Sequence, residues 1–240
     1  MKVIGIVPAR AGSTAVKNKN IRLLNNQPLL SYAINTGLNS SLDRVILSTD
    51  SPEYQEIGKK YNAETPFLRP KKFSTTTASS FDVIIHCLDF LKAEENYQPD
   101  AVFLLRPTSP FRTANQIDEA IQLLESENVD SVSAMTTVNQ HPYFMFQYDS
   151  NGKLFEYDQT ENKPERRQDL PRLWEANCHT MLSTADYLYR ENQQGGRSVV
   201  NFKNFIPYFI DGESALDIDT EEDFKYAEFL MSQENKNYYD

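Results

Sequence analysis

The sequence predicts an α/β fold in which helices cover both faces of a mainly parallel sheet. Short apolar runs rich in β-branched residues recur at residues 2–7, 44–49, 100–105 and 130–135, and each has a length that suits a buried strand. Helical patterns lie between these runs, and this alternation is typical of βαβ units. A chain of 240 residues can form one such doubly wound, Rossmann-like domain.

Helices are expected over residues 28–38, 52–61, 79–94 and 115–125. Two of them should place a proline, Pro28 or Pro52, at the first helical position, and Ser51 is the expected N-cap before Pro52. Near the end of the chain, regular structure is expected at residues 178–184 and 205–210, in a short helix from Ala185, and in an amphipathic helix over residues 220–231.

Ligands of an open parallel sheet bind beyond the carboxyl ends of its strands. We therefore expect the loops after Val7, Thr49, Leu105 and Met135 to share one face and to carry the chemistry.

Residues 141–176 interrupt the alternation. They are rich in Tyr, Phe, Asp, Asn, Gln and Arg, and they contain an Asn151-Gly152 hairpin signal. We interpret them as a small β-rich insertion in a single domain of residues 1–240. A monomer remains an alternative, but the aromatic residues of the insertion favour a homodimer: Tyr143, Phe144, Phe146 and Tyr148.

Composition excludes several classes of protein. The net charge of −10 argues against general nucleic-acid binding, which needs an excess of basic residues. No apolar run reaches the roughly 18 residues of a membrane span, so we expect a soluble cytoplasmic protein without a membrane partner. Cys87 and Cys178 lie far apart and have no zinc-type or disulfide-type spacing, so both are interpreted as core thiols.

The first functional signal is a basic loop directly after the first expected strand. Residues 1–42 contain five basic residues and no acid, whereas residues 211–240 contain ten acids and two bases. Such a loop could bind a phosphate through Arg10 and Lys19. An alternative is that the basic residues cluster there by chance. Lys17 and Arg22 could also be solvent-exposed residues without a ligand. The loop lacks both GxxxxGK[ST] and GxGxxG, which also disfavours a dinucleotide-dependent oxidoreductase.

The second signal is LDIDTEEDF at residues 216–224. If Asp217 and Asp219 end a strand, they project to the same side, and Thr220 can cap the next helix. Mg²⁺ binds one or two carboxylates together with phosphate oxygens. The alternative is that both acids only complement a helix dipole, and the spacing does not separate the two interpretations.

Two further segments resemble ligand-binding loops. In LLRPTSPFRT at residues 104–113, two prolines predict a rigid loop, and Arg106 and Arg112 would add positive charge to the same face. In LRPKKFSTTTASSF at residues 68–81, Arg69 and a run of hydroxyl residues precede a helix, for which Ser79 or Ser80 could be the N-cap.

Taken in order, these motifs resemble the acylneuraminate cytidylyltransferase family of sugar nucleotidyltransferases. The resemblance covers residues 2 to about 230 and is carried by VPARAGS, KNKNI, ILSTD, LRP, TASS, PTSPFRT, HP at 141–142, RRQDLP at 166–171, and DIDTEEDF. It implies a nucleotidyltransferase fold and a Mg²⁺-dependent transfer of CMP from CTP to the anomeric hydroxyl of a sialic-acid-like keto sugar, with release of pyrophosphate. It also implies nucleotide-sugar biosynthesis for surface glycans, and a homodimer formed through the insertion.

The resemblance also implies roles for individual residues. Arg10 and Lys19 would hold the triphosphate, and Asp219, linked to the metal, would accept the proton of the hydroxyl. The further nucleotide-binding residues would be Ser13, Asn20, Arg69, Ala78 and Ser80. The sugar-binding residues would be Arg106, Thr108 and Arg167, and the metal ligands Asp217 and Asp219.

The chain departs from the family pattern at several positions. Thr14 and Ala15 stand where the loop usually has lysine and glycine, and Thr76 replaces a frequent acid before TASS. Arg106 stands where a glutamine usually reads the sugar, and a guanidinium has donors only. Asn177-Cys178 replaces the usual Asn-Gly.

These departures leave three alternatives open. The chain could use CTP with legionaminic, pseudaminic or an octulosonic acid, or GTP with a sugar 1-phosphate, which would give Arg106 an anion to meet. It could also be a non-catalytic nucleotide-binding subunit. The sequence alone does not identify the acceptor sugar.

Overall fold

The described residues of the computed structural model, 1–13, 16–75, 77–164 and 166–233, contain a mixed six-stranded sheet in the order β10-β6-β9-β5-β1-β4. Thr14, Ala15 and Thr76 therefore lie outside the described residues. The strands of this sheet are β1 (Val3–Pro8), β4 (Arg44–Ser48), β5 (Ala101–Leu104), β6 (Ser131–Thr137), β9 (Trp174–Thr184) and β10 (Phe205–Phe209). β4, β1 and β5 are parallel, β6 and β10 are parallel, and β9 runs antiparallel between β5 and β6. The predicted mainly parallel sheet is confirmed.

The helices lie close to the expected ranges. They are α1 (Leu29–Leu38), α2 (Pro52–Lys60), α3 (Ser80–Glu95), α4 (Ala114–Ser126), α5 (Ala185–Gln193) and α6 (Glu221–Gln233). Ser51 caps α2 as predicted, because its hydroxyl accepts a hydrogen bond from the amide of Tyr54. The position expected for Pro28 was wrong by one residue: Pro28 is the residue before α1 and belongs to the short strand β3 (Gln27–Pro28), which pairs with β2 (Leu23–Leu24).

Two hydrophobic clusters hold the helices against opposite faces of the sheet. Alternate residues of β1 show the division: Val3 and Val7 belong to a cluster with α1 and α4, whereas Ile4 and Ile6 belong to a cluster with α3 and α5. This is the burial on both faces that continuous apolar strands predict. No helix in the described part of the chain combines the length and hydropathy that a membrane span requires.

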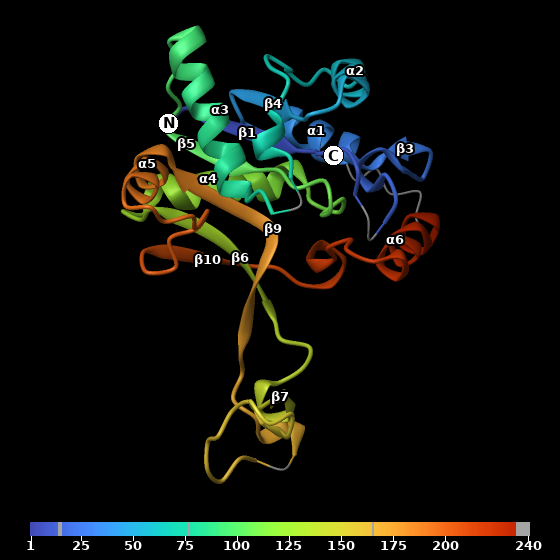
Figure 1. The fold of residues 1–240 in the computed structure, drawn as a ribbon, viewed down its shortest axis with the longest axis vertical. Coiled ribbons are helices and arrows are strands. Elements are labelled where there is room, and N and C mark those ends of the chain that lie inside the picture. Colours follow the sequence, from blue (N-terminus) through green and yellow to red (C-terminus); the bar gives the residue numbers. More distant parts are fainter. Residues whose placement is uncertain (14–15, 76, 165, 234–240) are drawn as a thin grey trace.

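A third cluster brings the end of the chain against its beginning. Ile218 and Phe224 are fully buried beside Leu24 and Leu29. α6 contacts β2 and lies on the same side of the sheet as β3 (Figure 1). The amide of Ile218 also donates to the carbonyl of Thr108, at 2.8 Å. The acidic segment around residue 218 is thereby fixed next to the loop that follows β5.

An arm projects from the sheet, and it contains the predicted hairpin (Figure 1). β6 and β9 continue as a pair up to Thr137 and Trp174, past a register shift after Ser133. Beyond them, β7 (Phe146–Tyr148) pairs antiparallel with β8 (Leu154–Glu156). Gly152 in the connecting turn has φ 76°, a conformation that glycine adopts without strain.

Candidate active site

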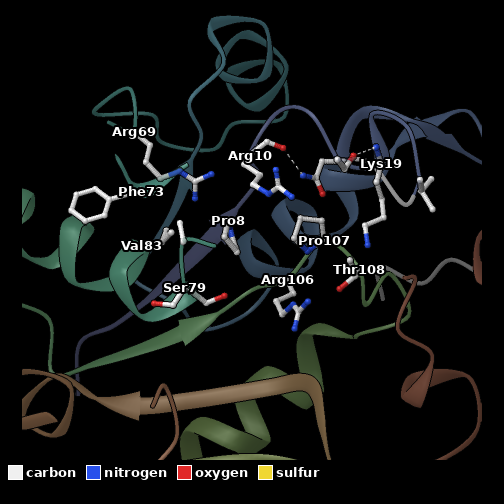
Figure 2. Close-up of a pocket in the computed structure, with 15 residues that line it drawn as sticks. Pro8, Arg10, Lys19, Arg69, Phe73, Ser79, Val83, Arg106, Pro107 and Thr108 are labelled. Carbon is white, nitrogen blue, oxygen red and sulfur yellow. Dashed lines mark hydrogen bonds between the residues drawn. The ribbon is translucent and has the colours of Figure 1, made fainter. Parts of the chain in front are cut away.

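A pocket of about 300 Å³ opens beyond the carboxyl ends of β1 and β5. Its walls are the loop after β1, the segment that leads into α3, and the loop after β5 (Figure 2). The pocket brings together nine residues that the sequence singled out: Arg10, Ser13, Lys19, Asn20, Arg69, Ala78, Ser80, Arg106 and Thr108. The expectation that the loop after Met135 joins them was wrong, because β6 continues to Thr137 and Met135 instead lines a separate pocket with Trp174.

Hydrogen bonds fix the basic loop after β1. The hydroxyl of Ser13 accepts from the amide of Lys19 at 2.7 Å, and the side-chain amide of Asn20 donates to the carbonyl of Arg10 at 3.1 Å. Both contacts are internal to the loop (Figure 2). The loop thereby presents Arg10 and Lys19 from fixed backbone positions, without a glycine-rich backbone. Arg22 has a different part, because its guanidinium binds Glu221 at 2.6 Å and ties the loop to α6.

Two guanidinium groups line the pocket. Arg10 comes from the loop after β1, and Arg69 from the segment that leads into α3 (Figure 2). Arg69 is only 4% exposed, and burial lowers the pKa of its guanidinium, an effect that the nearby charge of Arg10 reinforces and Asp50 opposes. The described residues that line the pocket include no carboxylate. Two like charges in a concave, partly dry site favour an anion between them.

The start of α3 forms another wall of the pocket. Ser79 is the N-cap, since its hydroxyl accepts from the amide of Asp82 at 3.1 Å. Ala78 and Ser80 lie on either side of it and line the pocket. The amino end of a 16-residue helix adds partial positive charge and favours an anion in the same place.

Arg106 and Arg112 do not share a face, contrary to the prediction. Arg106 lines the pocket and donates from Nη1 to the sulfur of Cys178 at 2.6 Å. Arg112 is 1% exposed and points into the core, where its Nε donates to the carbonyl of His179. The prediction of Cys178 as a core thiol was also wrong, because Cys178 is half-buried beside Arg106, whereas Cys87 is buried.

The two aspartates expected to bind a metal do not line the pocket, but Asp219 contacts Lys19, which does. Both aspartates follow a short 3₁₀ turn, not a strand, so the predicted strand end was wrong. Lys19 connects the loop after β1 to the acidic segment. Its ammonium donates to the carbonyl of Ile218 at 2.6 Å and to Oδ1 of Asp219 at 3.1 Å. Thr220 caps α6 as predicted.

The donor set fits a hard divalent cation that also binds phosphate. Oδ1 of Asp217 is buried and has no hydrogen-bond partner among the described residues, and such a carboxylate oxygen favours a cation nearby. The described residues contain no group of three or more His, Cys, Asp or Glu side chains that could hold a metal without other ligands. Two carboxylates completed by phosphate oxygens is the arrangement that Mg²⁺ prefers.

Arg167 is the one predicted site residue that lies in the arm. It belongs to the 3₁₀ turn Arg167–Asp169 and is exposed. It lines a pocket of about 270 Å³ together with Arg172 and His141. This second pocket shares no lining residue with the pocket around Arg10.

Sequence reasoning missed several residues of the pocket wall: Pro8, Val16, Phe73, Val83 and Pro107. It also missed the contact of Cys178 with Arg106. The aromatic ring and the apolar side chains offer a surface on which a planar base or a sugar ring could pack. In the sequence, the only feature that indicates these pocket residues is that they lie within or next to the motifs.

This chain is similar to known proteins over nearly its whole length. A family model described as Cytidylyltransferase matches residues 4–240. The N-acylneuraminate cytidylyltransferase of Escherichia coli is 32% identical over 237 residues, which cover 98% of this chain and 53% of that protein. The CMP-N,N'-diacetyllegionaminic acid synthase of Legionella pneumophila is 31% identical over 238 residues, which cover 96% of this chain and 97% of that protein. The chain therefore spans about half of the first relative and nearly all of the second.

Solved structures show the same fold at low identity. A CMP:2-keto-3-deoxy-manno-octonic acid synthetase complexed with CTP superposes with a TM-score of 0.72 at 13% identity, covering 97% of this chain and 99% of that one. A cytidylyltransferase from Leptospira borgpetersenii superposes with a TM-score of 0.62 at 17% identity, covering 100% and 90%.

Proposed function

The chain belongs to the cytidylyltransferase family, and from this premise we propose that it transfers CMP from CTP to the anomeric hydroxyl of an acidic keto sugar. The observation that carries the proposal is a pocket lined by Arg10, Lys19 and Arg69 whose described lining has no carboxylate. CTP fits this lining, with its triphosphate at Arg10 and Lys19 and the rest of the nucleotide near Arg69. Relatives named for N-acylneuraminate, N,N'-diacetyllegionaminic acid and pseudaminic acid support a nine-carbon keto acid as the acceptor.

The protein's own groups have distinct parts in the proposed reaction. Arg10 and Lys19 bind the triphosphate and stabilise the charge that moves onto the leaving pyrophosphate when the hydroxyl attacks the α-phosphorus. Ser13, Asn20, Arg69, Ala78 and Ser80 surround the nucleotide. Asp219 accepts the proton of the attacking hydroxyl. Mg²⁺, when held by Asp217 and Asp219 with phosphate oxygens, supplies Lewis-acid charge neutralisation.

The acceptor would lie at the end of the pocket that Arg106 and Thr108 form. The arm supports a homodimer, because large apolar side chains are exposed on it: Phe144 at 47%, Phe146 at 60% and Tyr148 at 71%. Arg167 cannot contribute to its own chain's pocket from its place on the arm, so its proposed contact with the sugar acid requires a second copy. We place the reaction in the cytoplasm, where CTP is made, as a step of nucleotide-sugar synthesis for surface glycans.

The test has two stages. The first is a thermal shift with CTP, GTP, UTP and ATP, each with and without Mg²⁺, and the proposal expects a CTP-specific rise in Tm that Mg²⁺ enlarges. The second is release of pyrophosphate with sialic, legionaminic, pseudaminic and octulosonic acids, with sugar 1-phosphates as the control acceptors. Preference for GTP with a sugar 1-phosphate would replace the proposal. Binding of CTP without turnover of any acceptor would indicate a non-catalytic subunit.

A further inference from the structure

Two side-chain amides hold the short turn that leads into the acidic segment. The turn is the 3₁₀ helix Gly212–Ala215, which ends two residues before the first of the two aspartates. Asn177 in β9 donates from Nδ2 to the carbonyl of Ala215 at 2.9 Å, and Gln116 in α4 donates from Nε2 to the hydroxyl of Ser214 at 3.2 Å. The bonded residues lie 38 and 98 positions apart. The turn is therefore fixed by tertiary contacts and not only by its own sequence.

The side chain of Asn177 is bonded at both ends. Its Nδ2 donates to Ala215, and its Oδ1 accepts from the amide of His179 at 2.8 Å. Rotation of this side-chain amide by half a turn would lose both bonds, since only the nitrogen donates and only the oxygen accepts. Asn177 does not line the pocket around Arg10. Its polar atoms serve the connection between β9 and the turn.

Gln116 is held by a buried chain of hydrogen bonds. Its Oε1 accepts from the amide of Thr113 at 2.9 Å and lies 3.0 Å from Nε2 of His179. Because Oε1 only accepts, Nε2 of His179 carries the hydrogen, and Nδ1 accepts from the hydroxyl of Thr180 at 2.8 Å. Burial lowers the pKa of His179 well below its usual value and so keeps the ring neutral. With the oxygen fixed in this way, the nitrogen of Gln116 is directed at Ser214.

The position of the first aspartate depends on its backbone. Oδ1 of Asp217 makes no hydrogen bond with the described residues, so the side chain is not fixed at that atom. On one side of Asp217, the backbone is fixed at Ile218 by bonds with Thr108 and Lys19. On the other side, the two amides fix the turn. A segment that is fixed at only one end can rotate about that end, so both attachments are needed to hold the aspartate in one place.

Resting on the proposed function, we propose that Asn177 and Gln116 are positioning residues of the cation site. By holding the turn Gly212–Ala215, they fix the backbone from which Asp217 presents its carboxylate to Mg²⁺ and the triphosphate. Neither residue touches substrate or cation. Their contribution is preorganisation: a segment that is already ordered loses less conformational entropy when the cation and nucleotide bind.

Each connection is one hydrogen bond, so each effect should be moderate. Ser214→Ala removes the acceptor of Gln116 and leaves the buried chain at His179 intact. It should raise the Mg²⁺ concentration that half-saturates CTP binding by about threefold, and Asn177→Ala should do the same. The two substitutions together should raise it by about tenfold, the lower end of the range for losing groups that orient metal ligands. Binding of CTP without a cation should be unchanged, because Arg10 and Lys19 remain.

The experiment measures the equilibrium binding of CTP by calorimetry during a Mg²⁺ titration, and the binding of Mn²⁺ in the presence of CTP by electron paramagnetic resonance. Gln116→Met and Ser214→Ala remove the same bond from its two ends, so the double variant should not move the Mg²⁺ midpoint further than Gln116→Met does. Ser183→Ala is the matched control. It removes a buried bond to the carbonyl of Val199 from the far end of β9 and should lower Tm without moving the midpoint.

The possible outcomes separate positioning from stability. An unchanged Mg²⁺ midpoint in both Ser214→Ala and Asn177→Ala would overturn the inference, whatever their Tm. A shift of equal size in Ser183→Ala would assign the effect to a general loss of stability and would also overturn it. If Gln116→Met does not fold, Ser214→Ala still decides, because it changes only a partly exposed turn.

The wild type tests the proposed function separately. Wild-type protein that binds CTP without any response to Mg²⁺ would remove the proposed cation site and this inference with it. A normal wild-type response to Mg²⁺, combined with unchanged midpoints in the variants, would overturn the inference alone.

Discussion

Replacing Arg106 by glutamine should selectively weaken binding of the acceptor sugar. The partner of Arg106 is the sulfur of Cys178 at 2.6 Å. Burial raises the pKa of the Cys178 thiol, so the sulfur is uncharged at neutral pH and leaves the charge of Arg106 available. A sugar acid offers a carboxylate that a guanidinium can bind through two parallel hydrogen bonds. Glutamine has two N–H donors and adds an acceptor, but it has no charge.

The size of the effect follows from the loss of this charge. Hydrogen bonds to charged groups contribute about 1.5–3 kcal/mol, and about 1.4 kcal/mol corresponds to a factor of ten. Arg106→Gln should thus lower kcat/KM for the acceptor by about 10- to 150-fold. The KM for CTP should change little, because Arg10, Lys19 and Arg69 remain.

The assay is steady-state release of pyrophosphate, with the acceptor varied at saturating CTP and then the reverse. Cys178→Ser is the matched control, since serine retains an acceptor for Arg106 and should leave both KM values within about threefold. A rise in the KM for CTP, with the KM for the acceptor unchanged, would show that Arg106 contacts the nucleotide and would refute the reasoning. An unchanged kcat/KM for the acceptor in Arg106→Gln would show that Arg106 does not contribute to acceptor binding.

Three other predictions follow from the geometry. Arg10→Met should weaken CTP about tenfold or more by calorimetry and leave the Tm of the free protein equal or higher, because it relieves repulsion of Arg69; a large fall in Tm without nucleotide would contradict this. Burial holds the pKa of His179 well below its usual value. Below about pH 6.5 the unfolded chain therefore binds a proton at His179 that the native protein excludes. The free energy of unfolding should fall by up to about 1.4 kcal/mol for each pH unit below that value. Urea unfolding measured at several pH values should show that the free energy of unfolding of His179→Gln falls less steeply with decreasing pH than that of the wild type. The double variant Phe146→Ser, Tyr148→Ser should be monomeric by light scattering and should bind CTP without transferring CMP to the acceptor. A variant that remains dimeric would argue against the arm as the interface.

The sequence predicted the strands and most helix starts because these depend on local patterns, and the rule for parallel sheets placed the loops after β1 and β5 on one edge. Several of the nine pocket residues, such as Asn20 and Ala78, came from the family resemblance alone. For β9 the sequence predicted regular structure only at residues 178–184. The strand spans Trp174–Thr184, begins inside the expected insertion and crosses the sheet antiparallel between β5 and β6. The contact of Arg106 with Cys178 and the burial of Arg112 both depend on that strand order. No local pattern encodes which strands become neighbours.

The segment around Asp217 shows a second limit. Alternation of Asp217, Ile218 and Asp219 resembles a strand, but no ladder forms there, and Ile218 is buried by packing and fixed by its bonds to Thr108 and Lys19. These are contacts between residues up to 199 positions apart. A period of two thus predicted a strand end where none forms.

The pair formed by Lys19 and Asp219 explains how an acidic protein keeps its pocket ready for an anion. The side chain of Asp219 is 65% exposed, and ion pairs of this kind contribute little to stability. Exchange of partners therefore costs little: in the proposed reaction Lys19 turns to the triphosphate, and Asp219 becomes free for the cation that arrives with it. The second bond of Lys19, to the buried carbonyl of Ile218, keeps the ammonium at the edge of the pocket during this exchange. Because breaking the pair costs little, the pair itself couples the binding of nucleotide and cation only weakly.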